Sequence, residues 1–200
     1  MRRIAVDVAL LPPLDVMEKA ISLNKELVEK FGSRIRLDKK TCIPHITLAM
    51  GCVDESDLPQ IRKKLQPLVE KYLPQEVLID GTVVPPLPNA AYFTVGKTPQ
   101  LQGLHEDVMN ELKEFLSYDV EKEMFFNPAD VTERTLRWVV DYPLKSSFEQ
   151  FKPHLTLGYG EKADDVHLIF RAFRLAVCQL GSSCTCRKIL FDFEVKEKKR

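Results

Sequence analysis

The sequence has no excess of charge of either sign and no long apolar run. Lysine and arginine together number 29, as do aspartate and glutamate, so the formal net charge is zero. A neutral chain creates no bulk positive field for nucleic acid, and any phosphate binding must therefore come from a local site. No apolar stretch approaches the roughly 18 residues that a membrane helix needs, so we expect no contact with a membrane.

Cysteine is scarce and irregularly spaced. The chain has five cysteines, an odd number, and only Cys184 and Cys186 lie close together. Because this distribution is not that of a disulfide framework, it favours a reducing, cytoplasmic compartment. The spacing supplies no further ligands beside the Cys184–Cys186 pair, so we predict no metal site and no cofactor.

Hydrophobic periodicity divides the chain into alternating strands and helices. The apolar start is interrupted by Asp7, which favours a first strand over a signal peptide. Gly32 is typical of a helix stop, and Thr98-Pro99 of a helix start. Strands are expected at residues 3–11, 76–84, 90–96, within 131–143, 173–181 and 188–195. Helices are expected at residues 14–31, from 54 or 56 to 72, and 99–115, and a short helical or looped stretch at 161–170.

This order of elements predicts one duplicated α+β domain over residues 1–200. Its motif-bearing halves span approximately 1–88 and 89–195, with strands that can exchange between them, and a charged tail follows at 196–200. In the second half, more residues precede the H-x-T motif than in the first half. We interpret the excess as a loop or hairpin near 117–140 that shapes a substrate entrance.

The two halves carry nearly identical phrases, PHITLAMG at 44–51 and PHLTLGYG at 153–160. Side chains alternate between the faces of a strand, so His45 and Thr47 share one face and His154 and Thr156 do the same in the second copy. The intervening aliphatic residues would be buried on the other face. One such motif is a weak signal, but two copies that also share proline and leucine are specific.

Two histidines, each beside a hydroxyl group, suit phosphodiester chemistry without a metal. One neutral imidazole can take a proton from the attacking oxygen, and an opposing imidazolium can give one to the leaving oxygen. Histidine can take either role near neutral pH, because its ordinary pKa is about 6.5. The threonine hydroxyls would donate to the nonbridging phosphoryl oxygens.

With its twin H-x-T motifs in a duplicated α+β chain, the sequence resembles the two-histidine (2H) phosphoesterase superfamily, in particular the RNA 2′,3′-cyclic phosphodiesterase and 2′-5′ RNA ligase family. The resemblance covers most of the chain and is weakest across 117–140. It implies a bilobal fold with two mainly antiparallel sheets facing a central cleft and helices on the outer faces. It also implies that His45 and His154 are the acid–base pair, that Thr47 and Thr156 bind phosphate, and that a 2′,3′-cyclic phosphate is opened to a 2′-phosphomonoester.

Other side chains carry weaker signals. Lys152 lies two positions before His154 and would add positive charge at the phosphate, or is a plain surface lysine. Tyr159 and Tyr92 would stack on a base or simply cover the sheet. We expect His105 to be a solvated surface residue, because Glu106 and Asp107 follow it.

Several substrates fit the same motifs. The expected partner is an RNA terminus or a small nucleotide, bound by a monomer with no obligate protein partner. Ligation or hydrolysis of 2′-5′-linked oligonucleotides, hydrolysis of cyclic phosphates on small metabolites, and a non-catalytic module that binds RNA termini are the alternatives.

Overall fold

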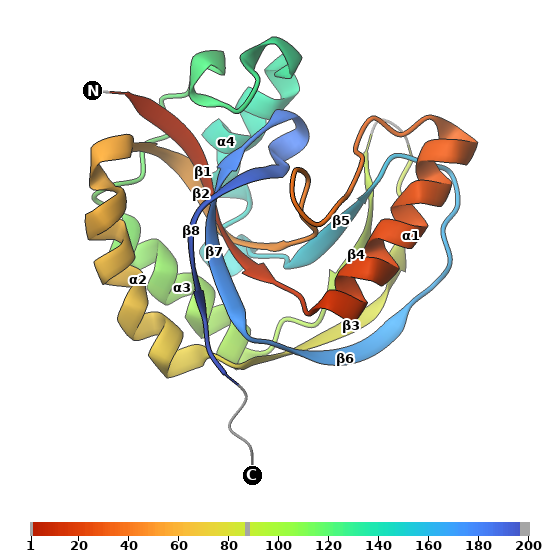
Figure 1. The fold of residues 1–200 in the computed structure, drawn as a ribbon, viewed down its shortest axis with the longest axis horizontal. Coiled ribbons are helices and arrows are strands. Elements are labelled where there is room, and N and C mark those ends of the chain that lie inside the picture. Colours follow the sequence, from red (N-terminus) through yellow and green to blue (C-terminus); the bar gives the residue numbers. More distant parts are fainter. Residues whose placement is uncertain (1, 87–88, 197–200) are drawn as a thin grey trace.

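The computed structural model describes residues 2–86 and 89–196 (Figure 1). Within these residues, eight strands form one curled antiparallel sheet, and four α-helices pack around it. The strands are β1 (Arg3–Leu11), β2 (Ile46–Asp54), β3 (Gln75–Val83), β4 (Ala91–Val95), β5 (His154–Gly158), β6 (His167–Ala172), β7 (Arg174–Leu180) and β8 (Cys186–Glu194). The helices are α1 (Leu14–Phe31), α2 (Leu58–Tyr72), α3 (Pro99–Leu112) and α4 (Glu133–Lys145). Beyond Lys196, the charged tail expected at 196–200 lies outside the described residues.

The sheet is continuous, with strand order β6-β3-β4-β5-β2-β1-β7-β8. The two facing sheets that the family resemblance implied are therefore one sheet. Its two four-stranded parts are joined only where Ile46 of β2 pairs with Leu155 of β5. Every strand pairing is antiparallel, as expected. The part with β1 and β2 also contains β7 and β8, from the end of the chain, and the part with β4 and β5 contains β3 and β6.

Several local signals in the sequence are confirmed. Gly32 ends α1 in the left-handed conformation, with a φ of 66°, and its N–H donates to the carbonyl of Val28. Thr98 caps α3, because its side chain accepts a hydrogen bond from the backbone N–H of Leu101 at 3.1 Å. In Figure 1, α2 and α3 lie beside each other on the outer side of the part formed by β2, β1, β7 and β8. These two helices therefore lie on an outer face of the sheet, as predicted.

The expected strand within 131–143 is wrong, because this stretch forms α4. Its valines and aromatic residues favour a strand locally, but Thr132 accepts a hydrogen bond from the N–H of Thr135 and so starts a helix. Thr135, Val139 and Tyr142 then follow at helical spacing and are buried. Tyr142 of this helix lines a cavity together with Thr47 of the first motif, while Val140 and Leu144 on the same helix are exposed.

The expectation of a solvated His105 is also wrong. His105 is fully buried, and its ring stacks on Phe151 with centroids 4.0 Å apart. Its Nδ1–H donates to the carbonyl of Leu48 at 2.6 Å, and its Nε2 accepts the N–H of Phe148 at 2.7 Å. The acidic residues after it were a misleading signal, because His105 also continues the apolar spacing set by Leu101 and Leu104.

No helix in the described part of the chain is long and apolar enough to cross a bilayer. All five cysteines are free thiols.

Replacing His105 by alanine should destabilise the protein by about 3 kcal/mol. The change removes a stacked ring and leaves the buried carbonyl of Leu48 and the partly buried N–H of Phe148 without their partner. Urea unfolding measures the effect. His167→Ala is the matched control, because His167 is exposed and pairs only with the exposed Asp165, so its loss should cost less than about 0.5 kcal/mol. Equal stability of the two variants would contradict the structural role given to His105.

Candidate functional site

The fold brings the two H-x-T motifs together on neighbouring strands. Ile46 and Leu155 oppose each other across antiparallel β2 and β5, and both are fully buried. Their neighbours project to the opposite face of the sheet. Continuing this register by one residue each way sets His45 beside Thr156, and Thr47 beside His154. The four residues predicted from the sequence therefore share one face of the sheet.

Both imidazoles are held in the same way by the chain that precedes them. Nδ1 of His45 lies 2.8 Å from the carbonyl oxygen of Ile43, and Nδ1 of His154 lies 2.9 Å from the carbonyl oxygen of Lys152. A carbonyl can only accept, so in each ring Nδ1 carries the hydrogen, and the lone pair of the neutral imidazole is on Nε2. The proline in each motif separates the histidine from the carbonyl that orients it.

Burial lowers the pKa of both histidines. His45 lies at the base of the site, and desolvation there disfavours its charged form. Desolvation by the surrounding residues likewise lowers the pKa of His154, although part of this residue is exposed to solvent. A positive charge on nearby His45 lowers it further. This effect of His45 on the pKa of His154 indicates that a positive charge on the first ring disfavours protonation of the second.

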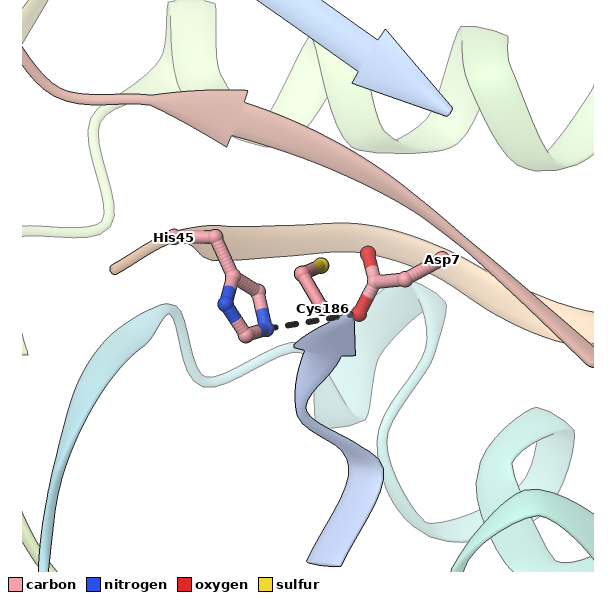
Figure 2. Close-up of side chains that lie close together, drawn as sticks. All are labelled: Asp7, His45 and Cys186. Carbon is pink, nitrogen blue, oxygen red and sulfur yellow. Dashed lines mark ion pairs between the residues drawn. The ribbon is translucent and has the colours of Figure 1, made fainter. Parts of the chain in front are cut away.

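A buried carboxyl group lies beside the first motif. Asp7 of β1 is completely inaccessible to solvent, and Thr47 Oγ1 lies 2.6 Å from its Oδ2 in a hydrogen bond. Nε2 of His45 is 3.6 Å from the same oxygen, and Figure 2 shows the two groups turned toward each other. Asp7 Oδ1 has no hydrogen-bond partner in the described part of the chain.

Burial raises the pKa of Asp7 to about 7, and the hydrogen bond from Thr47 only partly opposes this. The sequence reasoning used Asp7 only to recognise a strand and did not place it in the site. A signal was available, since Asp7 is the one charged residue within the otherwise apolar run of residues 4–11. In a strand this buried, a lone carboxyl group is expected to have a polar partner.

Asp7, His45 and Cys186 are the one group among the described residues whose ligand atoms could surround a metal ion, all lying within 4.8 Å of one another (Figure 2). Complete burial raises the pKa of the Cys186 thiol well above its ordinary value. A neutral thiol, a neutral imidazole and a carboxyl group with a raised pKa present little negative charge to a cation. The absence of a catalytic metal stays a prediction.

A cavity of about 510 Å³ opens beside Thr47 and His154. We call it the lysine cavity, because three lysines line it: Lys97, Lys145 and Lys152. No acidic side chain is among its described lining residues. Tyr92 also lines it, and its ring meets the ring of His154 edge to face, with centroids 5.3 Å apart. Lys152 and Tyr92 thus line a cavity beside His154, and their contact with a substrate stays a prediction.

Tyr159 does not line the lysine cavity. Its hydroxyl oxygen is 3.1 Å from Ser183 Oγ, and its ring borders a separate cavity of about 940 Å³. The sequence could not place Tyr159, because the chain has left β5 by this residue and strand alternation no longer applies.

Comparison with known proteins bears on the family and the fold. The family model described as the 2′-5′ RNA ligase superfamily matches residues 25–189. The solved structure TT0787 of Thermus thermophilus is 16% identical with a TM-score of 0.63, and the alignment covers 98% of this chain and 100% of that one. With the same coverage, E. coli LigT complexed with 3′-AMP is 12% identical with a TM-score of 0.57, and LigT complexed with NADP+ is 13% identical with a TM-score of 0.55. At these identities the likeness shows the fold. A search of curated proteins gave no match.

Replacing Asp7 by asparagine should change how stability depends on pH. The folded-state pKa of about 7 lies above the ordinary 3.8, so ionising Asp7 opposes folding. The wild-type protein should therefore lose up to about 4 kcal/mol of unfolding free energy through this group as pH rises from 4 to 8. Asp7→Asn should lack that loss and be more stable than wild type at pH 8.

Urea unfolding at a series of pH values measures this difference. The histidines, with lowered pKa values, act in the opposite direction in both proteins, so only the difference between wild type and variant reports Asp7. Parallel stability curves for the two proteins would show that Asp7 has an ordinary pKa.

Proposed function

The chain belongs to the 2′-5′ RNA ligase superfamily, and we propose that it is a metal-independent phosphodiesterase that opens 2′,3′-cyclic phosphates of RNA or nucleotides to 2′-phosphomonoesters. The observation that carries the proposal is the pair of imidazoles oriented alike on adjacent strands, each beside a threonine hydroxyl of the other motif. This arrangement offers two proton-transfer groups and two hydroxyl donors around a single position.

The reaction needs one proton transfer on each side of the phosphorus atom. One imidazole, neutral with its lone pair on Nε2, takes a proton from the attacking water as the new P–O bond forms. The other, protonated on Nε2, gives its proton to the 3′ oxygen as the P–O3′ bond breaks. After turnover the two rings have exchanged protonation states, and solvent restores them.

The threonines hold the charge on the phosphoryl oxygens, and Asp7 controls one of them. If Asp7 is ionised, it accepts the only hydroxyl hydrogen of Thr47. If Asp7 is protonated, it donates to Thr47 Oγ1, and the hydroxyl hydrogen is free for a phosphoryl oxygen. Since burial raises the pKa of Asp7 to about 7, the productive form persists at neutral and mildly acidic pH.

The lysine cavity supports a nucleotide as the substrate. Lys152 and Lys97 bring positive charge near the phosphate, and Tyr92 offers an aromatic surface beside His154. The similar structures of LigT hold 3′-AMP and NADP+, which are nucleotides of the same chemical class. The family match also favours 2′-5′ ligation as a second activity of the same histidines, because ligation uses the same cyclic phosphate with a ribose hydroxyl in place of water.

Alanine at His45 or at His154 should lower kcat/KM on a 2′,3′-cyclic nucleotide by about 10²–10⁴-fold, because each change removes one proton-transfer group. Thr47→Val and Thr156→Val should lower it less, by about 10–100-fold, since each removes one hydrogen bond to a charged oxygen. The assay uses catalytic amounts of protein with a chelator present, and His167→Ala is the matched control with unchanged activity.

Product analysis on a defined RNA with a cyclic end identifies the bond that breaks. A 3′-phosphomonoester product, a requirement for added metal, or full activity of either histidine variant would each contradict the proposed reaction. Binding of the RNA without turnover would favour the binding-module alternative.

The rate should have a bell-shaped pH dependence with its maximum below pH 6.5. The dependence of kcat/KM reports the free protein, which needs one neutral and one protonated imidazole. Both histidine pKa values are lowered from 6.5, so protonation of either ring becomes rare above that pH, and activity should fall as pH rises. Initial rates from pH 4.5 to 8.5 test this. A maximum above pH 7 would contradict the assigned pKa directions.

A further inference from the structure

The cavity of about 940 Å³ lies on the other side of the paired motifs from the lysine cavity. No residue lines both cavities among those described. Cys42, three residues before His45, lines the larger cavity, and so does Tyr159, three residues after Thr156. The lysine cavity is instead bordered by Thr47 and His154. One cavity thus adjoins the chain before His45 and after Thr156, and the other adjoins Thr47 and His154 themselves.

Three arginines line the larger cavity, which we call the arginine cavity: Arg34, Arg134 and Arg187. Asp130 is the only acidic residue among its described lining residues. Neither Arg34 nor Arg187 is in an ion pair within the described part of the chain. The guanidinium of Arg187 lies 5.7 Å from the centroid of the Phe126 ring, and its side chain also interacts with the thiol of Cys42. Guanidinium groups in a cavity lining are suited to bind a phosphate, because the planar fork of N–H donors matches two phosphate oxygens.

The same cavity carries aromatic rings. Trp138 of α4 lines it, with the guanidinium of Arg134 at 4.8 Å from the centroid of its ring. Tyr159 also lines the cavity, and a hydrogen bond between its hydroxyl and the side chain of Ser183 holds it there. Aromatic rings and guanidinium planes are the surfaces on which unpaired RNA bases stack.

One wall comes from the segment that had no counterpart in the first half of the sequence. Residues 129–132, 134 and 138 line the arginine cavity and belong to the end of the 117–140 excess. The segment forms short 3-10 helices and the start of α4 instead of the expected loop or hairpin, and its role in a substrate entrance stays a prediction. The volume is within the range of about 300–1,000 Å³ that small-ligand sites occupy.

We propose that the arginine cavity binds the nucleotide that precedes the cyclic-phosphate end of an RNA strand, with its phosphate on Arg187 and Arg34 and its base against Trp138. The terminal nucleoside then occupies the lysine cavity. This inference rests on the proposed function and makes it more specific, because the preferred substrate is an oligoribonucleotide end and not a mononucleotide. The zero net charge of the chain limits binding to these local contacts.

The test compares two substrates with each variant: a 2′,3′-cyclic mononucleotide and a tetranucleotide with a 2′,3′-cyclic end. Wild type should have a higher kcat/KM on the tetranucleotide. Arg187→Gln and Arg34→Gln should each lower that value by about tenfold or more and leave the mononucleotide value unchanged. Lys63→Gln on α2 is the charge-matched control, since this exposed lysine borders neither cavity. Equal losses on both substrates, or no wild-type preference for the tetranucleotide, would overturn the proposal.

Binding separates this inference from the proposed reaction. If neither substrate is turned over, the proposed reaction fails, and fluorescence anisotropy with the labelled tetranucleotide decides the role of the cavity. If the tetranucleotide binds more weakly to Arg34→Gln and Arg187→Gln than to wild type and Lys63→Gln, the proposed role of the arginine cavity is supported. Equal binding to all four proteins would overturn it. Arg34 is exposed, so its variant keeps the test valid if Arg187→Gln fails to fold.

Discussion

The single pairing of Ile46 with Leu155 determines the whole site. It joins the two parts of the sheet and fixes the register between two motifs that lie over a hundred residues apart. Because side chains alternate along a strand, a shift of one residue in either strand would bury its histidine and expose an aliphatic residue. The complete burial of Ile46 and Leu155 opposes such a shift, so the hydrophobic core holds the two motifs in register.

The polar groups of the site are oriented by the backbone and by burial, with little help from other charges. Backbone carbonyls fix both imidazole tautomers, and desolvation shifts the pKa of each titrating group in the site. Burial lowers the pKa values of the histidines and raises that of Asp7, so all three move toward neutral forms. The proposed reaction therefore needs one imidazole to take up a proton against this shift, which is why we expect the activity to be highest below pH 6.5.

Much of the site was predictable from the sequence, because strand alternation and the repeated H-x-T phrase are local patterns. The sequence could not show that β2 and β5 pair in one sheet, since pairing depends on contacts between distant segments. The same limit hid Asp7, whose role follows from its neighbour Thr47 on another strand. His105 was misjudged because its charged sequence neighbours suggested exposure, whereas its buried partners come from β2 and from residues 148–151. For α4, local strand propensity competed with a helix cap and with a buried face that only tertiary packing reveals.

A crystal structure with the 2′-phosphomonoester product bound tests the central claim most directly, since it locates the phosphorus atom relative to both rings. We expect the phosphate between the two Nε2 atoms, each within hydrogen-bond distance of a phosphoryl oxygen, with the hydroxyl groups of Thr47 and Thr156 on the remaining oxygens. A phosphate bound away from either imidazole, or contacting only one motif, would contradict the claim that the two histidines act on one phosphorus atom.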